Sequence, residues 1–300
     1  MGRKKRKGGG GNGILQFLPV LAVVVAMGFD YYATVFVFID HWIAGGVQSD
    51  RGLLHAGVFT WITFMCSFSF CVAAISDPGS VPVNYGPDAE NPQKEGTKSR
   101  SCEKCDAYKP PRSHHCRVCK RCVLKMDHHC LWMNNCVGYS NYKPFLIFIL
   151  HAAIGSLYST VIYFCDLFQT NHDFSVRSTA LFYVLSGCFL FFLSLTMSTL
   201  LGWHIYLLTK NMTTIEFRAF LRDKWLAKKS GQKYRHRFDI GICNNISQVL
   251  GPNILKWFCP TSMGHLRDGT QFPVSYIIDM CHCQVRISMP LPPKIDITVI

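Results

Sequence analysis

Charged side chains are scarce in this chain of 300 residues. They make up 16% of it, whereas a soluble globular domain carries about a quarter. Acidic groups are the scarcest, with 18 Asp and Glu against 31 Lys and Arg, which leaves a net charge of +13. The shortage of charge excludes an ordinary soluble domain and predicts that lipid surrounds part of the chain. The basic excess is typical of proteins that meet nucleic acid or an anionic membrane surface.

Lysine and arginine are missing altogether from four apolar runs, residues 14–39, 53–76, 145–168 and 180–209. A helix needs about 20 apolar residues to cross about 30 Å of hydrocarbon, and each run is long enough. Four such runs are hard to bury in one soluble domain. The sequence therefore predicts an all-α polytopic membrane protein with four transmembrane helices. Asp30 lies inside the first run, either as an intramembrane polar contact or, as we prefer, near the far headgroups.

The positive charges also orient the helices. Of the 31 Lys and Arg, 29 fall before the first run, between the second and third, or after the fourth. By the positive-inside rule, both termini and the long middle loop face the cytosol. We expect an integral protein of the endomembranes (Golgi or ER) or the plasma membrane. Its cytosolic parts are a basic N-terminus (1–13), a linker (77–100), a cysteine-rich zinc module (101–144) and a C-terminal region (210–300).

Cysteine is abundant and unevenly distributed. Seven of the 15 cysteines lie between residues 102 and 136, together with four histidines. These candidate metal ligands are Cys102, Cys105, His114, His115, Cys116, Cys119, Cys122, His128, His129, Cys130 and Cys136. The C-x2-C pairs 102/105 and 116/119 are typical of structural zinc, which gives a short segment with few aliphatic residues its folding free energy. Two zinc ions need eight ligands, so three of the eleven candidates are spare.

The stretch Asp127-His128-His129-Cys130 indicates which groups are spare. In an extended segment, successive side chains point to opposite faces, so His128 and Cys130 share one face and His129 takes the other. If His129 binds zinc, His128 and Cys130 form a free imidazole–thiol pair, the arrangement that generates a nucleophilic thiolate. Asp127 could orient His128 as a triad acid does. Strict alternation places Asp127 on the zinc side, so this role requires a turn.

Other zinc modules fit the cluster poorly. A C2H2 finger places two spaced histidines about twelve residues after its cysteine pair, but His114 and His115 are adjacent and come too early. A RING-like module would end in another C-x2-C, whereas five residues separate Cys130 from Cys136. No apolar-faced recognition helix follows the cysteine pairs, so we expect no nucleic-acid partner.

The cluster resembles the DHHC-type protein S-acyltransferases, or palmitoyltransferases, over roughly residues 14–251. Besides the DHHC tetrapeptide at 127–130, the chain has DPG at 77–79, TTIE at 213–216 (the family's TTxE), and GICNNISQVLG at 241–251. The last resembles the family's C-terminal motif, with Asn245 in the Asn position. Two residues depart from the pattern: Leu131 stands where the family usually has Pro, and Ile246 replaces an aromatic residue.

The resemblance implies a role for each residue of the cluster. One structural zinc would be held by Cys102, Cys105, His115 and Cys122, and the other by Cys116, Cys119, His129 and Cys136. Cys130 would be the acylated nucleophile, His128 its base and Asp127 the orienting group. Residues implied to support acyl-CoA binding or the active site are Lys109, Arg112, His114, Trp132, Phe145, Phe148, Thr214, Glu216 and Asn245. For these the plainer alternatives are a solvated basic face, ordinary helix packing and a helix cap.

The expected function follows from the resemblance. The protein would move a palmitoyl group, or another long acyl chain, from acyl-CoA to cytosolic cysteines of membrane-associated proteins, through an acyl-enzyme intermediate on Cys130. A thiol nucleophile for such a donor belongs at the membrane surface, because each buried methylene of the chain contributes about 0.8 kcal/mol. The alternatives are a non-enzymatic membrane scaffold with a zinc-binding interaction module, and a zinc-handling or thiol-redox protein.

Overall fold

The computed structural model of the protein describes residues 15–86, 100–232 and 234–275; the predicted segment 1–13 lies outside them. The helices α1 to α7 are Leu18–Tyr32, Asp40–Trp42, Asp50–Ile75, Tyr142–Gln169, Arg177–Thr209, Thr214–Lys229 and Ile242–Leu250. The strands β1 to β6 are Arg100–Cys102, Ala107–Lys109, His114–Cys116, Arg121–Val123, His128–Cys130 and Asn135–Val137. Short helical turns η1, η3, η5 and η6 span Leu15–Phe17, Gly46–Gln48, Leu131–Met133 and Ile254–Lys256, and a π-helix, η2, spans Ala33–Ile39.

Four helical segments are long and apolar enough to cross a membrane: Leu15–Trp42, Asp50–Ile75, Tyr142–Gln169 and Arg177–Thr209. The predicted fold class, an all-α polytopic protein with four spans and a cysteine-rich module between the second and third, is confirmed. The last three helices begin about one turn before the predicted apolar runs. Hydropathy does not register these first turns because they are polar; in α3 the turn is capped by Ser49, which accepts a hydrogen bond from a backbone N–H.

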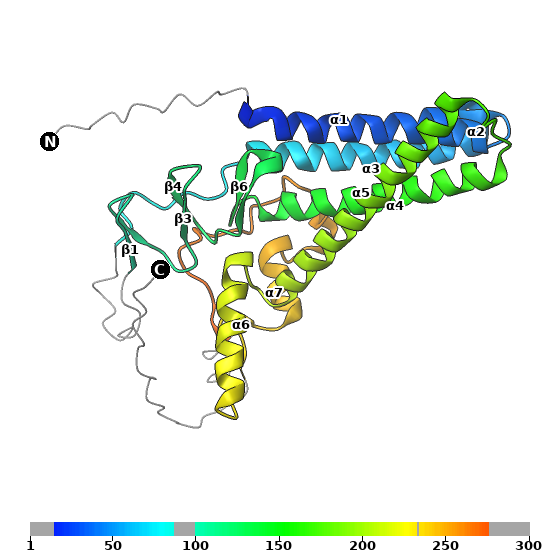
Figure 1. Cartoon of the computed structure of the whole chain (residues 1–300). Helices are drawn as coiled ribbons and strands as arrows, with labels where there is room; N and C mark the ends of the chain where they lie inside the picture. The colour runs from blue at the N-terminus through cyan, green and yellow to red at the C-terminus, as the bar shows by residue number, and fades with distance from the viewer. Residues whose placement is uncertain (1–14, 87–99, 233, 276–300) are drawn as a thin grey trace, which may run out of the picture.

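The helices α1, α3 and α4 run side by side, and α5 crosses them obliquely (Figure 1). The longest helix–helix interface is that of α3 with α4. Polar groups also join the helices inside the apolar layer: Thr34 of η2 donates a hydrogen bond to Ser159 of α4 at 2.9 Å and lies 3.4 Å from Asp30. The preferred position of Asp30 near the far headgroups is therefore wrong. Asp30 makes an intramembrane polar contact, because the first span continues to Trp42, three helical turns beyond it.

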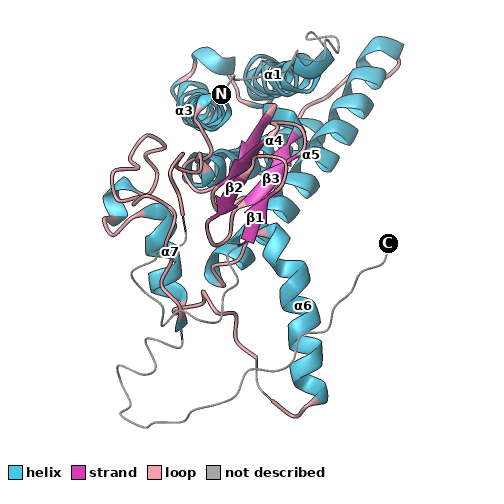
Figure 2. Ribbon diagram, turned by 90° about the vertical axis from the view of Figure 1, so that its left-hand side faces the viewer, coloured by secondary structure: helices cyan, strands magenta, loops and turns pink. Residues whose placement is uncertain are grey.

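Six short strands form three antiparallel hairpins at one end of the helices (Figures 1 and 2). Each hairpin begins fourteen residues after the one before it, at Arg100, His114 and His128. The backbone conformation repeats at the same interval. The last residue of the connecting turn has positive φ in each hairpin, at Asp106, Lys120 and Asn134. Hairpins this small have no apolar core of their own, so their stability must come from what binds between them.

The polypeptide after α5 returns to the hairpins. Thr213 caps α6 in a capping box with Glu216: the Thr213 hydroxyl accepts from the Glu216 N–H, and the Glu216 carboxylate accepts from the Thr213 N–H. The short helix α7 then packs against α5 and α4. These contacts bring the TTIE segment and the hairpins together at the same end of the membrane helices.

Candidate active site

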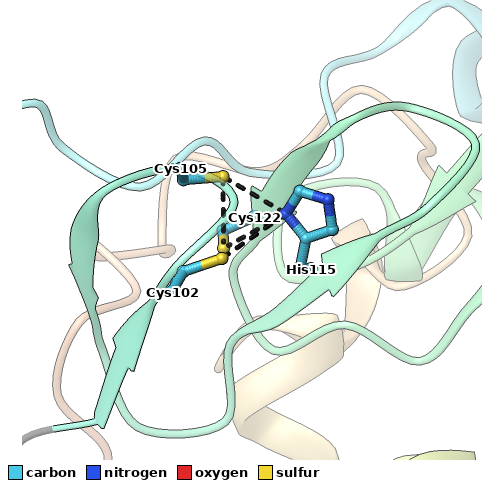
Figure 3. Close-up of side chains that lie close together, drawn as sticks. All are labelled: Cys102, Cys105, His115 and Cys122. Carbon is cyan, nitrogen blue, oxygen red and sulfur yellow. Dashed lines mark hydrogen bonds between the residues drawn. The ribbon is translucent and has the colours of Figure 1, made fainter.

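The ligand residues of the first cluster come from two neighbouring hairpins. Cys102 and Cys105 lie at the turn of the β1–β2 hairpin, while His115 and Cys122 face each other across β3 and β4 (Figure 3). The Nδ1 atom of His115 lies 3.2 Å from the sulphur of Cys105 and 3.6 Å from that of Cys102. The sulphurs of Cys105 and Cys122 are 3.8 Å apart.

The second cluster repeats the first, one hairpin further along. Cys116 and Cys119 lie at the turn of the β3–β4 hairpin, and His129 and Cys136 face each other across β5 and β6. The Nδ1 atom of His129 lies 3.7, 3.5 and 3.5 Å from the sulphurs of Cys116, Cys119 and Cys136. The structure thus gathers the eight residues into the two groups that the resemblance implies.

These separations fit tetrahedral zinc. With Zn–S of about 2.3 Å and Zn–N of about 2.0–2.1 Å, two ligand atoms at a tetrahedral angle lie about 3.6 Å apart for S and N and about 3.8 Å for two S. The observed distances run from 3.2 to 4.0 Å. Three thiols and an imidazole at such distances would make only weak hydrogen bonds. Both clusters are therefore built to hold a metal ion.

Asp127, His128 and Cys130 belong to neither cluster. Asp127 precedes β5, and its Oδ2 accepts a hydrogen bond from Nδ1 of His128 at 2.7 Å. The contact that this role requires is therefore present. Thr214 fixes the carboxylate from the other side: its N–H donates to Oδ1 and its hydroxyl to Oδ2, each at 2.8 Å. A carboxylate with three hydrogen bonds and 2% exposure has one orientation available.

The electrostatics of this group favour an ion pair. Burial by itself lowers the pKa of His128, but hydrogen bonds to Asp127 and Cys130 outweigh it and raise the pKa from 6.5 to about 9. Burial raises the pKa of Asp127, and the hydrogen bond and charge of His128 then bring it below its usual value. Asp127 and His128 therefore lie side by side as a carboxylate and an imidazolium.

Cys130 lies where the hairpins meet the membrane helices. It is 9% exposed and shares an apolar cluster with Phe70 of α3 and with Phe145 and Ile149 of α4. The ring of Phe145 meets that of His128 edge to face, with centroids 5.5 Å apart. Apolar side chains of the membrane helices therefore surround Cys130 on one side, and His128, held by Asp127, lies on the polar side.

His204 is a neighbour of His128 that the sequence reasoning missed. This buried histidine of α5 lies 6.1 Å from the ring of His128 and 4.9 Å from that of Phe145, and Tyr142 is hydrogen bonded to its Nδ1 at 3.1 Å. It places a second imidazole beside the reactive group. Its position inside the fourth apolar run was a usable signal, because an ionisable residue within a membrane helix is a functional candidate by default.

Arg112 has a different position from the one expected. Its side chain is fully buried and forms a double hydrogen bond to Glu216, at 2.8 and 2.7 Å, and two more to Asn211. It has no surface to offer a CoA head group, so that prediction is wrong, as is the alternative of a solvated basic face for this residue. Glu216 instead uses Arg112 to brace the cysteine-rich module against α6.

Lys125 joins the same buried network. Its ammonium lies 3.1 Å from Oδ1 of Asn211, the residue that also binds Arg112. Burial, assisted by the charge of Arg112, lowers the pKa of Lys125 from 10.5 to about 7. Lys125 was not singled out from the sequence, because nothing local distinguishes it from a surface residue.

Two asparagines that the sequence reasoning also missed attach the third hairpin to α3. The side-chain N–H groups of Asn135 donate to the carbonyls of Ala74 and Ser76, at 3.0 and 2.8 Å, and Asn141 donates to that of Ala73 at 3.1 Å. A helix leaves its last four carbonyls without partners, and these amides satisfy two of them, together with that of the C-cap residue Ser76. The hairpin that carries Cys130 is thereby fixed at the end of a membrane helix.

The remaining predicted residues are spread over the module. Asn245 is fully buried and donates to the carbonyl of Thr209 at 2.8 Å, so it ties α7 to the end of α5. Trp132 is 56% exposed beside Cys130, and Phe148 packs on Phe70. Lys109 lies in β2 and His114 in β3, both half-buried and outside the two metal clusters.

The fold and the site define a membrane protein with two clusters of candidate metal ligands and, outside them, a buried thiol where the hairpins meet the membrane helices. The sequence model of the DHHC palmitoyltransferase family matches residues 95–220. Probable protein S-acyltransferase 15 of Arabidopsis thaliana is 51% identical over 253 residues, which cover 83% of this chain and 99% of the relative. Palmitoyltransferase ZDHHC20 of Homo sapiens is 31% identical over 297 residues, which cover 88% and 78%.

The chain therefore belongs to the DHHC palmitoyltransferase family. It is an integral membrane enzyme that transfers palmitoyl groups to proteins. The enzyme interpretation is confirmed, and the scaffold and redox alternatives are not needed to account for the thiol outside the metal clusters.

Proposed function

We propose that Cys130 carries the acyl group from a long-chain acyl-CoA, such as palmitoyl-CoA, to cysteines of protein substrates. The observation that supports this most directly is the double environment of Cys130. Its thiol contributes to the raised pKa of His128 on one side, and it packs against membrane residues of α3 and α4 on the other. A thioester donor with a polar head and an apolar chain needs both environments at its reactive carbon.

The reaction then has two steps of the same kind. The Cys130 thiolate attacks the carbonyl carbon of the acyl-CoA, the bond from that carbon to the CoA sulphur breaks, and CoA leaves as a thiolate that takes a proton from His128. A substrate thiol next gives its proton to His128 and attacks the Cys130 thioester, and Cys130 leaves as the thiolate. One thioester is exchanged for another in each step. Asp127 and Thr214 keep the imidazole in place throughout.

Zinc is proposed as the metal of both clusters. Bound by three thiolates and one imidazole each, it would supply folding free energy to hairpins that cannot fold as an apolar core. It takes no part in the transfer, since the eight ligands leave no open position. Cys130 itself stays outside both sets.

The acyl chain would extend from Cys130 among the membrane helices. An apolar groove of about 520 Å³ lies between α1 and α5, lined by residues that include Ala26, Phe29, Leu185 and Ser186. We propose that it accepts the distal part of the chain. Ala26→Phe should then shift the preference toward shorter acyl groups in a competition assay. An unchanged preference would show that the acyl chain does not occupy this groove.

The test of the nucleophile is direct. Purified protein incubated with palmitoyl-CoA should gain one palmitoyl group, released by hydroxylamine, and peptide mapping should place it on Cys130. Cys130→Ser should gain none, whereas the control Cys259→Ser should label as the wild type does, because Cys259 is an exposed thiol in the C-terminal segment. Labelling of Cys130→Ser at the wild-type rate would overturn the assignment.

The orientation is part of the proposal. Both termini and the catalytic module would face the cytosol of an endomembrane (Golgi or ER) or the plasma membrane, where membrane-associated substrates present cytosolic cysteines. Lys109 and His114 remain candidates for the CoA head group. In sealed vesicles with the cytosolic face outward, a membrane-impermeant maleimide should label Cys259. Labelling only after the vesicles are opened would show that the C-terminal region faces away from the cytosol, the opposite of the proposed topology.

A further inference from the structure

A further group of metal-ligating side chains, separate from the two cysteine clusters, lies at the end of the membrane helices away from the hairpins. His41 belongs to α2, Asp166 to the last turn of α4, and His172 to the loop between α4 and α5. One ligand atom from each of the three lies within 4.8 Å of the others. In Figure 1 the label of α2 marks this end, and the strands lie at the other. Neither palmitoyl transfer nor the cysteine clusters use these residues.

Asp166 is the unusual member of the group. Its carboxylate is fully buried, and while Oδ2 accepts a hydrogen bond from Tyr183 at 2.5 Å, Oδ1 has no hydrogen-bond partner. Within the described part of the chain, no Lys or Arg pairs with it; the nearest basic group is Nε2 of His172, 3.4 Å from Oδ1. A buried carboxylate without a countercharge is costly, and the free oxygen points at a histidine.

The spacing is that of a metal site. For Zn–N of about 2.0–2.1 Å and Zn–O of about 2.0–2.2 Å, two ligands at a tetrahedral angle lie about 3.4 Å apart. His172 Nε2 and Asp166 Oδ1 are separated by 3.4 Å, and so are His41 Nδ1 and the hydroxyl of Tyr183. A metal ion would replace the proton by which His172 now donates to the backbone carbonyl of Asp166 at 3.1 Å.

We propose that His41, Asp166 and His172 bind a divalent transition-metal ion, with Tyr183 adjacent to it. Two imidazoles and one carboxylate favour zinc or another borderline first-row ion over calcium or magnesium, which take oxygen ligands. One bound cation would neutralise the buried carboxylate and join α2, α4 and the loop before α5. The exposed face of His41 gives the ion a path of entry.

The experiment counts metal in the purified full-length protein. After equilibration with excess zinc and removal of free ion, the wild type should hold three zinc ions per chain by elemental analysis, and Asp166→Asn and His172→Gln should hold two. Zinc, but not magnesium, should raise the midpoint of thermal unfolding of the wild type. His55→Gln is the matched control, since His55 lies at the same end but binds Tyr158 at 2.6 Å instead.

Two further arms keep the result unambiguous. If the Asp166 variant fails to fold, His41→Ala serves, because His41 is exposed and its loss removes a ligand without opening the core. Cobalt added to protein whose cysteine clusters hold zinc should give the weak bands of nitrogen and oxygen ligation without thiolate charge transfer. A third zinc retained in all variants, or absent from the wild type, would overturn the proposal.

Discussion

The second and third hairpins are built alike and end differently. SHHC at 113–116 and DHHC at 127–130 occupy equivalent positions, so Cys130 in the third hairpin corresponds to Cys116 in the second. Cys116 completes a metal cluster with its partner Cys119 and with the facing pair of the next hairpin. In the third hairpin, Met133 takes the position of Cys119 and is 97% buried among membrane residues. The helix α4 follows this hairpin in place of a fourth hairpin.

The difference shows how a thiol is released from metal binding. Each cluster needs the turn of one hairpin and the facing pair of the next, so the last turn in the series has no facing pair to use. Cys130, the cysteine at that turn, therefore stays outside both metal clusters as a thiol. Asp127 then stands where the second hairpin has Ser113, which only donates to the carbonyl of Pro110. Two replacements, Met133 for Cys119 and Asp127 for Ser113, and one missing hairpin therefore distinguish the surroundings of Cys130 from those of Cys116.

The largest effect is expected from replacing each of the two equivalent cysteines, Cys130 and Cys116, by serine. Cys130→Ser should reduce acyl transfer to background with both zinc ions and the thermal stability retained. Cys116→Ser should release zinc from the second cluster and unfold the module, because metal contributes about 10–16 kcal/mol of apparent folding free energy in such sites. Elemental analysis and transfer assays on both variants check this. Zinc loss in Cys130→Ser would mean that Cys130 is a ligand after all.

The next effect concerns the residue that precedes each HHC. Asp127→Asn should slow formation of the acyl-enzyme by about 10²–10⁴-fold, as for other oriented acid–base groups, while Ser113→Ala should leave it unchanged. Removing the negative charge should also lower the pKa of His128 from about 9. The upper limb of the pH–rate profile should therefore move to lower pH. An unshifted profile would show that Asp127 acts only through packing.

A smaller effect is expected from the network that joins the loops before the two hairpins. Arg112 and Lys125 both bind Asn211, and Arg112 also pairs with Glu216. Burial raises the pKa of Glu216, but the charge and hydrogen bonds of Arg112 lower it below 4.5 overall. A depressed carboxyl pKa adds stability that is present above pH 4.5 and is lost as the pH falls through the folded-state pKa.

Glu216→Gln isolates this contribution, because glutamine preserves the capping box but not the ion pair. The variant should lose about 1.5–3 kcal/mol of unfolding free energy at neutral pH. Thermal unfolding followed from pH 7 to below the folded-state pKa of Glu216 should bring the two proteins together in acid. Curves that stay parallel over this range would show that the ion pair does not set the acid sensitivity of the module.

The smallest effect is expected at Leu131, where the family usually has proline. Leu131 is the first residue of η5, and Cys130 before it has φ −89° and ψ 111°, the extended conformation that a following proline requires. Leu131→Pro should therefore change the transfer rate by less than about twofold and stabilise the protein by about 0.4–1 kcal/mol. A large loss of activity would show that the Leu131 N–H or side chain has a role in the turn.

Local patterns in the sequence predicted much of the site. Hydropathy located the four membrane helices, since the need for about 20 apolar residues leaves a long signal. Alternation in an extended strand separated His128 and Cys130 from His129. The fourteen-residue repeat was also present in the sequence, as HHC at 114–116 and 128–130, and would have indicated from the spacing alone that the last cysteine of the series has no partner turn.

Long-range contacts could not be predicted in the same way. Three contacts join segments 61 to 104 residues apart: the ion pair that buries Arg112, the approach of His204 to His128, and the hydrogen bond from Asn135 to the carbonyl of Ala74. No local period records such pairs. Arg112 in particular looks like a surface charge in the sequence, and only its partner Glu216 explains why it is buried.

The sequence by itself determined that this chain crosses a membrane four times, gathers cysteine and histidine between the second and third crossings, and carries the DHHC signature. These properties depend on composition, period and spacing, which are local. The tertiary structure alone decided that Thr214 holds Asp127 on His128 and that Cys130 faces the apolar helices. It also placed His41, Asp166 and His172 together. Each depends on packing between distant segments, and packing is fixed only when the whole chain has folded.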